Sequence, residues 1–540
     1  MQHDAAQPDR GGFGATRPWP AGWPLVLFAM LAALNFTVYR SALSGEFLSD
    51  DYGYIVTSMY TSELTTESIL SIIDPTGPAR LYTANYAPVH LLATALERQI
   101  FADDVRGYHW VNLLVHTANA VLLVALLIGS GIPRLGALLG GLVFSLHPAN
   151  VEAVAWISQL KTNGALALSL AALLLLRRHP AWALSVFALA LLTKAAAASA
   201  LPAAAALVWA RRGSSRDWAW LGAWTLALVL YSIPQFSSFA HLGSVDVPAY
   251  DDPWLHMRTI VSVGMRYLAM AATSYGVSAF QEPAPVHSWV DPWWLMGLIA
   301  GSLLAARAWI VLRRRSEEGA YWIFAAASFV PVSQIFPFLH PVADRYLYFI
   351  LPGLIGALLL MGVETLNGGV RRASKGTKGG LGVLSPGVVI PAAMVLWLGI
   401  SVLFALSSAE RAKLWRRETF LLVDAATHYP DGGTASFLRA RSAAQRGDVE
   451  GAVAELRAAS DRGIDSFSTL LGDAGLAPIA QTPAFQSLIR EVAGKWIDRA
   501  HARGYSTQAE LRMLGHAHLM REEYDQALGA LEGALQAGGP

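Results

Sequence analysis

The sequence predicts an all-α protein in which a polytopic membrane domain precedes a smaller helical-repeat domain. Hydrophobic residues make up 54% of the 540 residues and charged residues only 15%, a balance typical of a polytopic helical membrane protein. Apolar runs that can form membrane helices recur up to about residue 407 and then stop. The absence of cysteine excludes disulfides, iron–sulfur clusters and thiolate zinc sites, and a net charge of +1 gives no indication of a nucleic-acid partner.

The N-terminal tail, residues 1–21, is polar and is expected in the cytoplasm. The apolar stretch that follows, about 22–38, has no small-residue cleavage site after it, so we predict a retained first span. Ten more apolar stretches bring the count to about eleven spans in a membrane domain of residues 22–407. They lie near residues 109–129, 135–148, 163–176, 181–193, 196–210, 218–236, 293–311, 320–338, 346–363 and 384–407.

Positive charge sets the predicted orientation, because cytoplasmic loops hold an excess of Lys and Arg. The clustered Lys and Arg residues can all be cytoplasmic with eleven spans, which places the C-terminus and a large first loop, residues 42–108, outside. Lys194 then lies at an outer tip.

Segment 257–275 is long enough to cross the membrane, but crossing would place the run Arg313 to Arg315 outside. We therefore predict an interfacial or re-entrant helix, in which Arg258 and Arg266 face headgroups or a polar cavity.

The stretch HPANVEAVAWI, residues 147–157, is the strongest candidate for a functional motif. An apolar span ends there in a His, a Glu and a Trp, and a charge at the bilayer centre costs about 2.5–3.5 kcal/mol, so such groups usually serve a function. Glu152, near Lys161, is therefore a candidate site residue. The alternative is an interfacial cap in which Trp156 anchors the helix end.

An acidic pair, Asp50 and Asp51, follows the first span in the motif SDDYGY. Adjacent carboxylates raise each other's pKa, which suits a general base or a metal ligand; the alternative is a helix cap followed by a first-turn acid. Cations at outer span ends, Lys161, Lys194 and Arg345, would suit an anionic lipid phosphate, although Arg345 could instead snorkel to the interface.

His147 and Glu152 would be separated by about 140° of net rotation on an unbroken helix. Pro148 can end the helix and let both side chains turn toward an outer cavity. There they could complete a divalent-cation site with Asp50 or Asp51, or Glu152 could orient Lys161 by a charge-assisted hydrogen bond. We favour the second arrangement, because a hard-metal site needs more oxygen ligands. No metal or other cofactor is expected on that view, with divalent-cation dependence left open.

Several blocks in this order resemble the transmembrane and tetratricopeptide-repeat O-mannosyltransferase family and its bacterial relatives, which have the GT-C glycosyltransferase fold. The resemblance covers about residues 40–410. The most specific blocks are LHPANVEAVAWI and the ADRYLY segment that contains Asp344 and Arg345. The weaker blocks are SDDY, YAPVH with His90, the stretch from Tyr108, and LLTK.

The resemblance implies a GT-C-type membrane domain that transfers a sugar, with mannose as the candidate, from a polyprenyl-phosphate donor to an extracytoplasmic acceptor. The acidic pair would supply the base, and His90, His147, Glu152 and Asp344 would support the site. It also implies a bacterial inner-membrane location, contact with membrane lipids, and a protein or glycan acceptor. Relatives carry Arg-Pro where this chain has Ala87-Pro88, and they have an additional Arg and Asp near Lys161.

Residues 408–540 are predicted to form an extracytoplasmic domain that resembles tetratricopeptide repeats. A helix, a Gly447-Asp448 turn and a second helix fit residues 437–463, and a second hairpin fits 510–535. Residues 476–492 look like a degenerate unit between them. Fewer than three good repeats is marginal for a free-standing solenoid, so this domain is expected to pack on the membrane domain or a partner.

Two function classes remain open from the sequence. The first is an inverting glycosyltransferase in which Asp50 or Asp51 is the base and Lys161, Lys194 or Arg345 stabilises the leaving phosphate. The second is a catalytically silent membrane scaffold that recruits envelope proteins. We favour the enzyme, because both carboxylates and all three cations are present.

Overall fold

The computed structural model describes residues 22–77, 79–82, 85–240, 252–335, 341–374, 386–503 and 508–537. Within these ranges the chain is helical, apart from turns, loops and one isolated antiparallel bridge between Gln281 and Val342. The N-terminal and first-loop helices are α1 (Trp23–Tyr39), η1 (Ala42–Ser44), η2 (Tyr52–Val56), α2 (Thr66–Ile73), α3 (Ala79–Tyr82) and α4 (Pro88–Phe101). The remaining helices of the predicted membrane domain are α5 (Val105–Gly129), α6 (Arg134–Leu146), α7 (Asn150–Ala155), η3 (Ile157–Gln159), α8 (Leu160–Leu175), α9 (Pro180–Leu191), η4 (Ala195–Ser199), α10 (Ala200–Ala210), α11 (Ser215–Ala240), α12 (Pro253–Thr273), α13 (Pro292–Arg313), α14 (Glu318–Phe329), η5 (Val330–Val332), α15 (Asp344–Ser374) and α16 (Pro386–Leu414).

Five helices of the described chain are long and apolar enough to cross a membrane, so the protein is an integral membrane protein. They are Val105–Gly129, Ser215–Ser238, Pro292–Arg313, Asp344–Leu366 and Pro391–Leu414. The apolar windows of α13 and α16 are only 11% and 17% buried inside the protein, so most of their surface is available to lipid. Four shorter apolar helical segments accompany them, and the total of eleven spans stays a prediction.

Segment 257–275, which the sequence predicts as an interfacial or re-entrant helix, lies largely in α12. This helix is not among the five candidate spans. Both of its arginine side chains contact other parts of the protein. The Arg258 side chain is buried and donates to the Val286 carbonyl oxygen at 2.9 Å. The Arg266 guanidinium lies over the Trp293 ring, 4.6 Å from its centroid.

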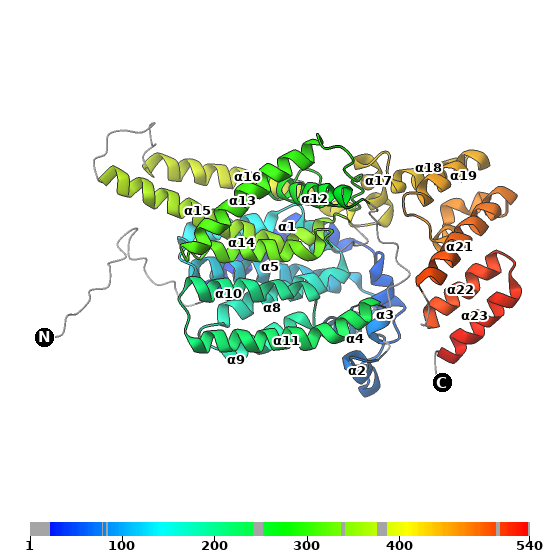
Figure 1. The fold of residues 1–540 in the computed structure, drawn as a ribbon, viewed down its shortest axis with the longest axis horizontal. Helices are drawn as coiled ribbons and strands as arrows, with labels where there is room; N and C mark the ends of the chain where they lie inside the picture. Colours follow the sequence, from blue (N-terminus) through cyan, green and yellow to red (C-terminus); the bar gives the residue numbers. More distant parts are fainter. Residues whose placement is uncertain are drawn as a thin grey trace.

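The membrane domain is a bundle in which α5 packs against α1, α6 and α8, and α14 packs against α15 and α10. Figure 1 shows the first-loop helices α2, α3 and α4 at one end of this bundle, the same end that bears the C-terminal helices. Helix α6 ends at Leu146 as predicted from Pro148, and a short helix, α7, then leads into α8. This break places the HPANVE motif inside the bundle instead of on a continuous span.

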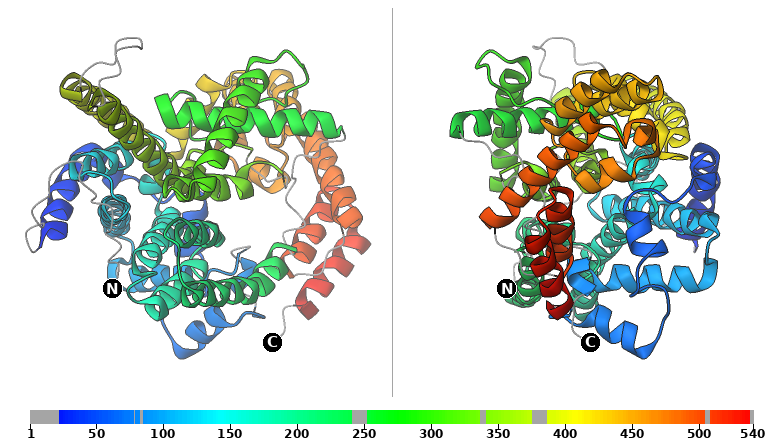
Figure 2. Two further views of the ribbon diagram at one scale, coloured as in Figure 1. Left: turned by 60° about the vertical axis from the view of Figure 1, so that its left-hand side comes forward. Right: turned by 90° about the vertical axis from the view of Figure 1, so that its right-hand side faces the viewer.

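The C-terminal helices are α17 (Glu418–His428), α18 (Gly433–Gln445), α19 (Val449–Ser460), α20 (Phe467–Gly472), η6 (Ala474–Ile479), α21 (Pro483–Arg503), α22 (Gln508–Met520) and α23 (Tyr524–Ala537). The two predicted hairpins correspond to α18 with α19 and α22 with α23, and Figure 2 shows the domain as a curved array. Helix α16 continues past residue 407, and α17 was not predicted. The domain has its own apolar core, and its assignment to tetratricopeptide repeats stays a prediction.

We predict that the C-terminal domain and the loop after α8 lie on opposite sides of the membrane. The chain has no cysteine, so single cysteines report accessibility directly. Ala484→Cys, at an exposed position, should react with an impermeant maleimide in intact spheroplasts. Arg178→Cys, also at an exposed position, should react only after the membrane is permeabilised. The opposite labelling pattern would refute the predicted orientation. Position 432 is unsuitable, because a Cβ atom there would lie 2.2 Å from the Glu282 carboxylate, and positions 376 and 504 lie outside the described residues.

Candidate active site

The two carboxylates of the acidic pair have different environments. The Asp51 side chain is buried and accepts hydrogen bonds from the Leu48 amide at 2.9 Å, from the Ser158 amide at 2.8 Å and from the Ser158 hydroxyl. Burial is the main cause that raises the pKa of Asp51 to about 7, and repulsion from Asp50 adds the smallest contribution. Asp51 thus ties the first loop to the turn before α8.

Asp50 is the accessible member of the pair. Its side chain is 45% exposed, and its carboxylate lies 3.7 Å from the Lys161 ammonium group. The same ammonium group donates to the Tyr54 hydroxyl at 3.1 Å and lies 4.7 Å from the centre of the Tyr54 ring. Burial lowers the pKa of Lys161, but Tyr54 and Asp50 together raise it above its ordinary value, so the lysine remains charged. Because Asp51 is buried and Asp50 is exposed, Asp50 is the carboxylate of the pair that a proton donor from outside can reach.

Glu152 does not pair with Lys161 as predicted; it pairs with Arg345. The Arg345 amide donates to one Glu152 oxygen at 2.7 Å, and the Arg345 guanidinium contacts the other oxygen. The physical reason is that Arg345 is in the first turn of α15, where backbone amides have no intrahelical acceptor, so the carboxylate satisfies both this amide and the side-chain charge. The Glu152 side chain is 1% exposed and that of Arg345 13%.

Lys194, between α9 and η4, completes the group of cations. Its ammonium group donates to the Thr162 hydroxyl at 2.7 Å. Burial, followed by repulsion from Lys161 and Arg345, lowers the pKa of Lys194 well below its ordinary value, while Glu152 and Asp50 oppose that shift. These five charged groups are therefore close enough to interact, and we call them the charged cluster: Asp50, Glu152, Lys161, Lys194 and Arg345.

His147 and Asp344 are close in sequence to members of the charged cluster, but their side chains contact other residues. One ring nitrogen of His147 contacts the Ala271 carbonyl oxygen at 3.1 Å, and the ring packs edge-on against Phe404, so it does not turn toward Glu152. Asp344 accepts from the Ser278 amide and the Gln281 side chain and pairs with Arg411. The arrangement of His147, Glu152 and an acid that the metal alternative needs is therefore not formed. Among the described residues, no three His, Asp or Glu side chains gather in a way that could hold a metal ion.

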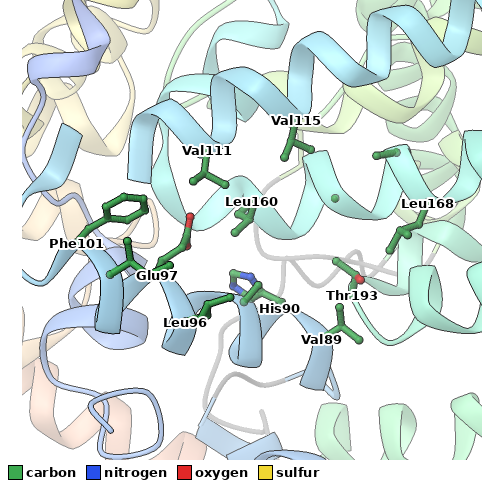
Figure 3. Close-up of a pocket in the computed structure, with 14 residues that line it drawn as sticks. Val89, His90, Leu96, Glu97, Phe101, Val111, Val115, Leu160, Leu168 and Thr193 are labelled. Carbon is green, nitrogen blue, oxygen red and sulfur yellow. The ribbon is translucent and has the colours of Figure 1, made fainter. Parts of the chain in front are cut away.

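A pocket of about 420 Å³ adjoins the cluster, between α4, α5 and α8. It is lined mainly by apolar side chains, and two of its lining residues, Leu160 and Thr193, directly precede Lys161 and Lys194 in the chain. Figure 3 shows the His90 imidazole and the Glu97 carboxyl group on its α4 wall. His90 packs edge-on against Tyr54, and burial together with Lys161 and Lys194 lowers its pKa well below its ordinary value, so its ring is neutral.

Sequence reasoning missed three contributors to this site. Tyr54 lies within the quoted SDDYGY motif, and its aromatic ring next to the acidic pair was the available signal. Ser158, within HPANVEAVAWIS, binds Asp51, but nothing in its local pattern indicates this contact. Glu97 is buried in the pocket wall, and an acid on the apolar face of the amphipathic α4 could have been noticed.

No family model matches the sequence, and no curated protein is significantly similar to it. Among solved structures, the chain is similar to the crystal structure of ArnT from Cupriavidus metallidurans bound to undecaprenyl phosphate, with 14% sequence identity and a TM-score of 0.34. The match covers 78% of this chain and 81% of that one. At this TM-score the two chains share too little geometry for the match to define the fold or activity of this protein.

The pKa of Glu97 tests whether the pocket wall is apolar, because this carboxyl group lines the pocket. Burial raises the pKa of Glu97 to about 8, whereas an unfolded Glu has a pKa of about 4.3. Because the folded state holds this proton more tightly, the wild-type protein should lose stability as the pH rises from about 4 to about 8, at no more than about 1.4 kcal/mol per pH unit. The glutamine of Glu97→Gln cannot ionise. The melting temperature of this variant should therefore equal that of the wild type at about pH 4 and exceed it at about pH 8.

The matched control for this experiment is Glu63→Gln, which changes an exposed residue of the same loop. It should show the wild-type pH dependence. If Glu97→Gln also follows the wild-type curve at every pH, Glu97 is solvated and the pocket wall is not apolar at that point.

Proposed function

We propose that the protein is a GT-C-type membrane glycosyltransferase that transfers a sugar from a polyprenyl-phosphate donor to an acceptor hydroxyl on the extracytoplasmic side. One observation carries this proposal: an accessible carboxylate, Asp50, lies 3.7 Å from Lys161 within a cluster that also holds Lys194 and Arg345. The cluster adjoins an apolar pocket. A base, an anion-binding site and a place for a hydrocarbon chain are the three elements that such a reaction needs.

The charge balance of the cluster favours an anionic ligand. Three basic side chains face two carboxylates, and Glu152 is paired with Arg345. The lowered pKa of Lys194 reflects the cost of burying it beside other cations. A phosphate bound next to Lys194 would reverse that effect, because an opposite charge favours the ammonium form. Lys161, Lys194 and the outer edge of Arg345 are therefore the proposed phosphate ligands.

In the proposed step, Asp50 removes the proton from the acceptor hydroxyl while the acceptor oxygen attacks the anomeric carbon of the sugar. The bond between that carbon and the phosphate oxygen breaks, and the lipid phosphate leaves with both bonding electrons. The attack comes from the face opposite the leaving group, so the configuration inverts. Lys161 and Lys194 stabilise the charge that develops on the departing oxygen.

The lipid chain of the donor would occupy the pocket between α4, α5 and α8. Its walls are apolar, the His90 ring is neutral, and Glu97, with a pKa of about 8, is mostly uncharged at pH 7. Mannose as the sugar, and a protein or glycan as the acceptor, rest on the sequence resemblance alone. The predicted bacterial inner-membrane location fits a polyprenyl-phosphate donor, which is a membrane lipid.

We expect Asp50→Asn to lower turnover by roughly 100-fold or more without changing the melting temperature, because the amide keeps the shape but cannot accept the proton. Asp51→Asn should instead lower the melting temperature, because the buried carboxylate accepts three hydrogen bonds that an amide can only partly replace. Turnover with lipid-linked sugar in purified membranes, and thermal unfolding in detergent, measure the two effects. Near-normal turnover of Asp50→Asn would reject Asp50 as the base.

Arg345 tests the anion site separately. Arg345→Lys keeps the charge but loses the fork that Glu152 and a phosphate share, so the KM for the donor should rise, and Arg345→Ala should raise it further. Donor saturation curves of both variants measure this order. Equal and small changes in KM would show that Arg345 does not contact the donor.

A further inference from the structure

Segment 277–282, between α12 and α13, lies against the N-terminus of α15, which bears Arg345. Asp344 accepts a hydrogen bond from the Ser278 amide at 3.2 Å and another from the Gln281 side chain at 2.5 Å. Gln281 also forms the isolated bridge with Val342. The residue immediately before Arg345 is thus held by a segment that contributes nothing to the charged cluster.

The same segment holds the C-terminal domain. The Asp424 carboxylate of α17 accepts from the Ser278 hydroxyl at 3.1 Å and from the Ala279 amide at 3.2 Å. Glu282 accepts hydrogen bonds from the Gly433 amide at 2.5 Å and the Thr434 amide at 3.1 Å, at the start of α18. Two consecutive C-terminal helices are therefore attached to one short segment.

Arg411, near the end of α16, joins these two sets of contacts. Its guanidinium lies 3.4 Å from Asp344 and 3.7 Å from Asp424, and it also donates to the Val277 carbonyl oxygen at 3.0 Å. The side chains of Asp344, Arg411 and Asp424 are only 1%, 11% and 9% exposed. Because both acidic side chains contact the same buried guanidinium, moving either one away would leave the Arg411 charge without one of its acceptors in the interior. The three side chains should therefore move together.

We propose that Asp424 and Arg411 are positioning residues for Arg345, so that docking of the C-terminal domain sets the geometry of the anion site. The link runs from Asp424 through Arg411 and Ser278 to Asp344, and from Asp344 along the backbone to the Arg345 amide that binds Glu152. Loss of the Asp424 contacts lets the first turn of α15 shift, and the hydrogen bond from the Arg345 amide to Glu152 then weakens. The identity of the anion rests on the proposed function, whereas the link itself does not.

The experiment uses full-length protein in nanodiscs and the variant Asp424→Asn, which leaves the pair of Arg411 and Asp344 in place. Its first readout needs no ligand: hydrogen exchange of a peptide that covers residues 342–350, where the Arg345 amide donates to Glu152. We expect this peptide to exchange at least several-fold faster in Asp424→Asn than in the wild type. The matched control is Asp465→Asn, which removes a carboxylate that pairs with Arg499 inside the C-terminal domain, and its exchange in this peptide should be unchanged.

The second readout is the affinity for undecaprenyl phosphate in a double-mutant cycle with Arg345→Gln. Asp424→Asn should weaken binding several-fold in the wild-type background and have little effect in the Arg345→Gln background, because Asp424 acts through Arg345. An equal loss in both backgrounds, or unchanged exchange of the 342–350 peptide, would overturn the proposal. Faster exchange in a protein that does not bind undecaprenyl phosphate at all would reject the proposed donor while supporting the link.

Discussion

The contact between Glu152 and Arg345 is the interaction on which the rest of the site depends. A carboxylate and a guanidinium that are 1% and 13% exposed are stable in the interior only when their hydrogen bonds are satisfied, and Glu152 achieves this by accepting from both the side chain and the backbone amide of Arg345. The pair joins α7 to the first turn of α15 and orients the guanidinium over the rings of Trp156 and Tyr346. Lys161 and Lys194 lie near enough to this pair for their pKa values to respond to it.

The acidic pair shows how one motif can supply two different functions. Asp51 turns inward and binds Ser158, so it fixes the first loop on the turn before α8. Asp50 is adjacent in the chain and remains accessible beside Lys161. The buried member holds the loop, and this placement in turn presents the accessible member to the cluster. Tyr54 contributes to the same placement, because its hydroxyl and its ring both contact the Lys161 ammonium group.

The C-terminal domain has a more direct relation to the site than a free docking module would have. Its first two helices are attached to the segment that holds Asp344, and Arg411 connects both sides. The charged cluster and the C-terminal domain are thus connected through buried charged side chains. A catalytically silent scaffold has no need for contacts that lead from the C-terminal domain to Arg345. In an enzyme, an acceptor or partner bound to the C-terminal domain would act on Arg345 through these contacts.

The sequence by itself determined the elements that depend on local pattern: the membrane class, most apolar helices, the helix end before Pro148 and the two C-terminal hairpins. It also named all five members of the charged cluster, because isolated charges next to apolar runs are conspicuous. Their pairing was decided only by the tertiary structure. Lys161 is nearer to Glu152 in the chain, yet Glu152 binds Arg345. The Arg345 amide in the first turn of α15 has no acceptor within the helix, so it adds a hydrogen bond to the ion pair. The different burial of Asp50 and Asp51 likewise depends on Ser158, which is distant in the chain, and the role of Arg411 depends on three segments that meet only after folding.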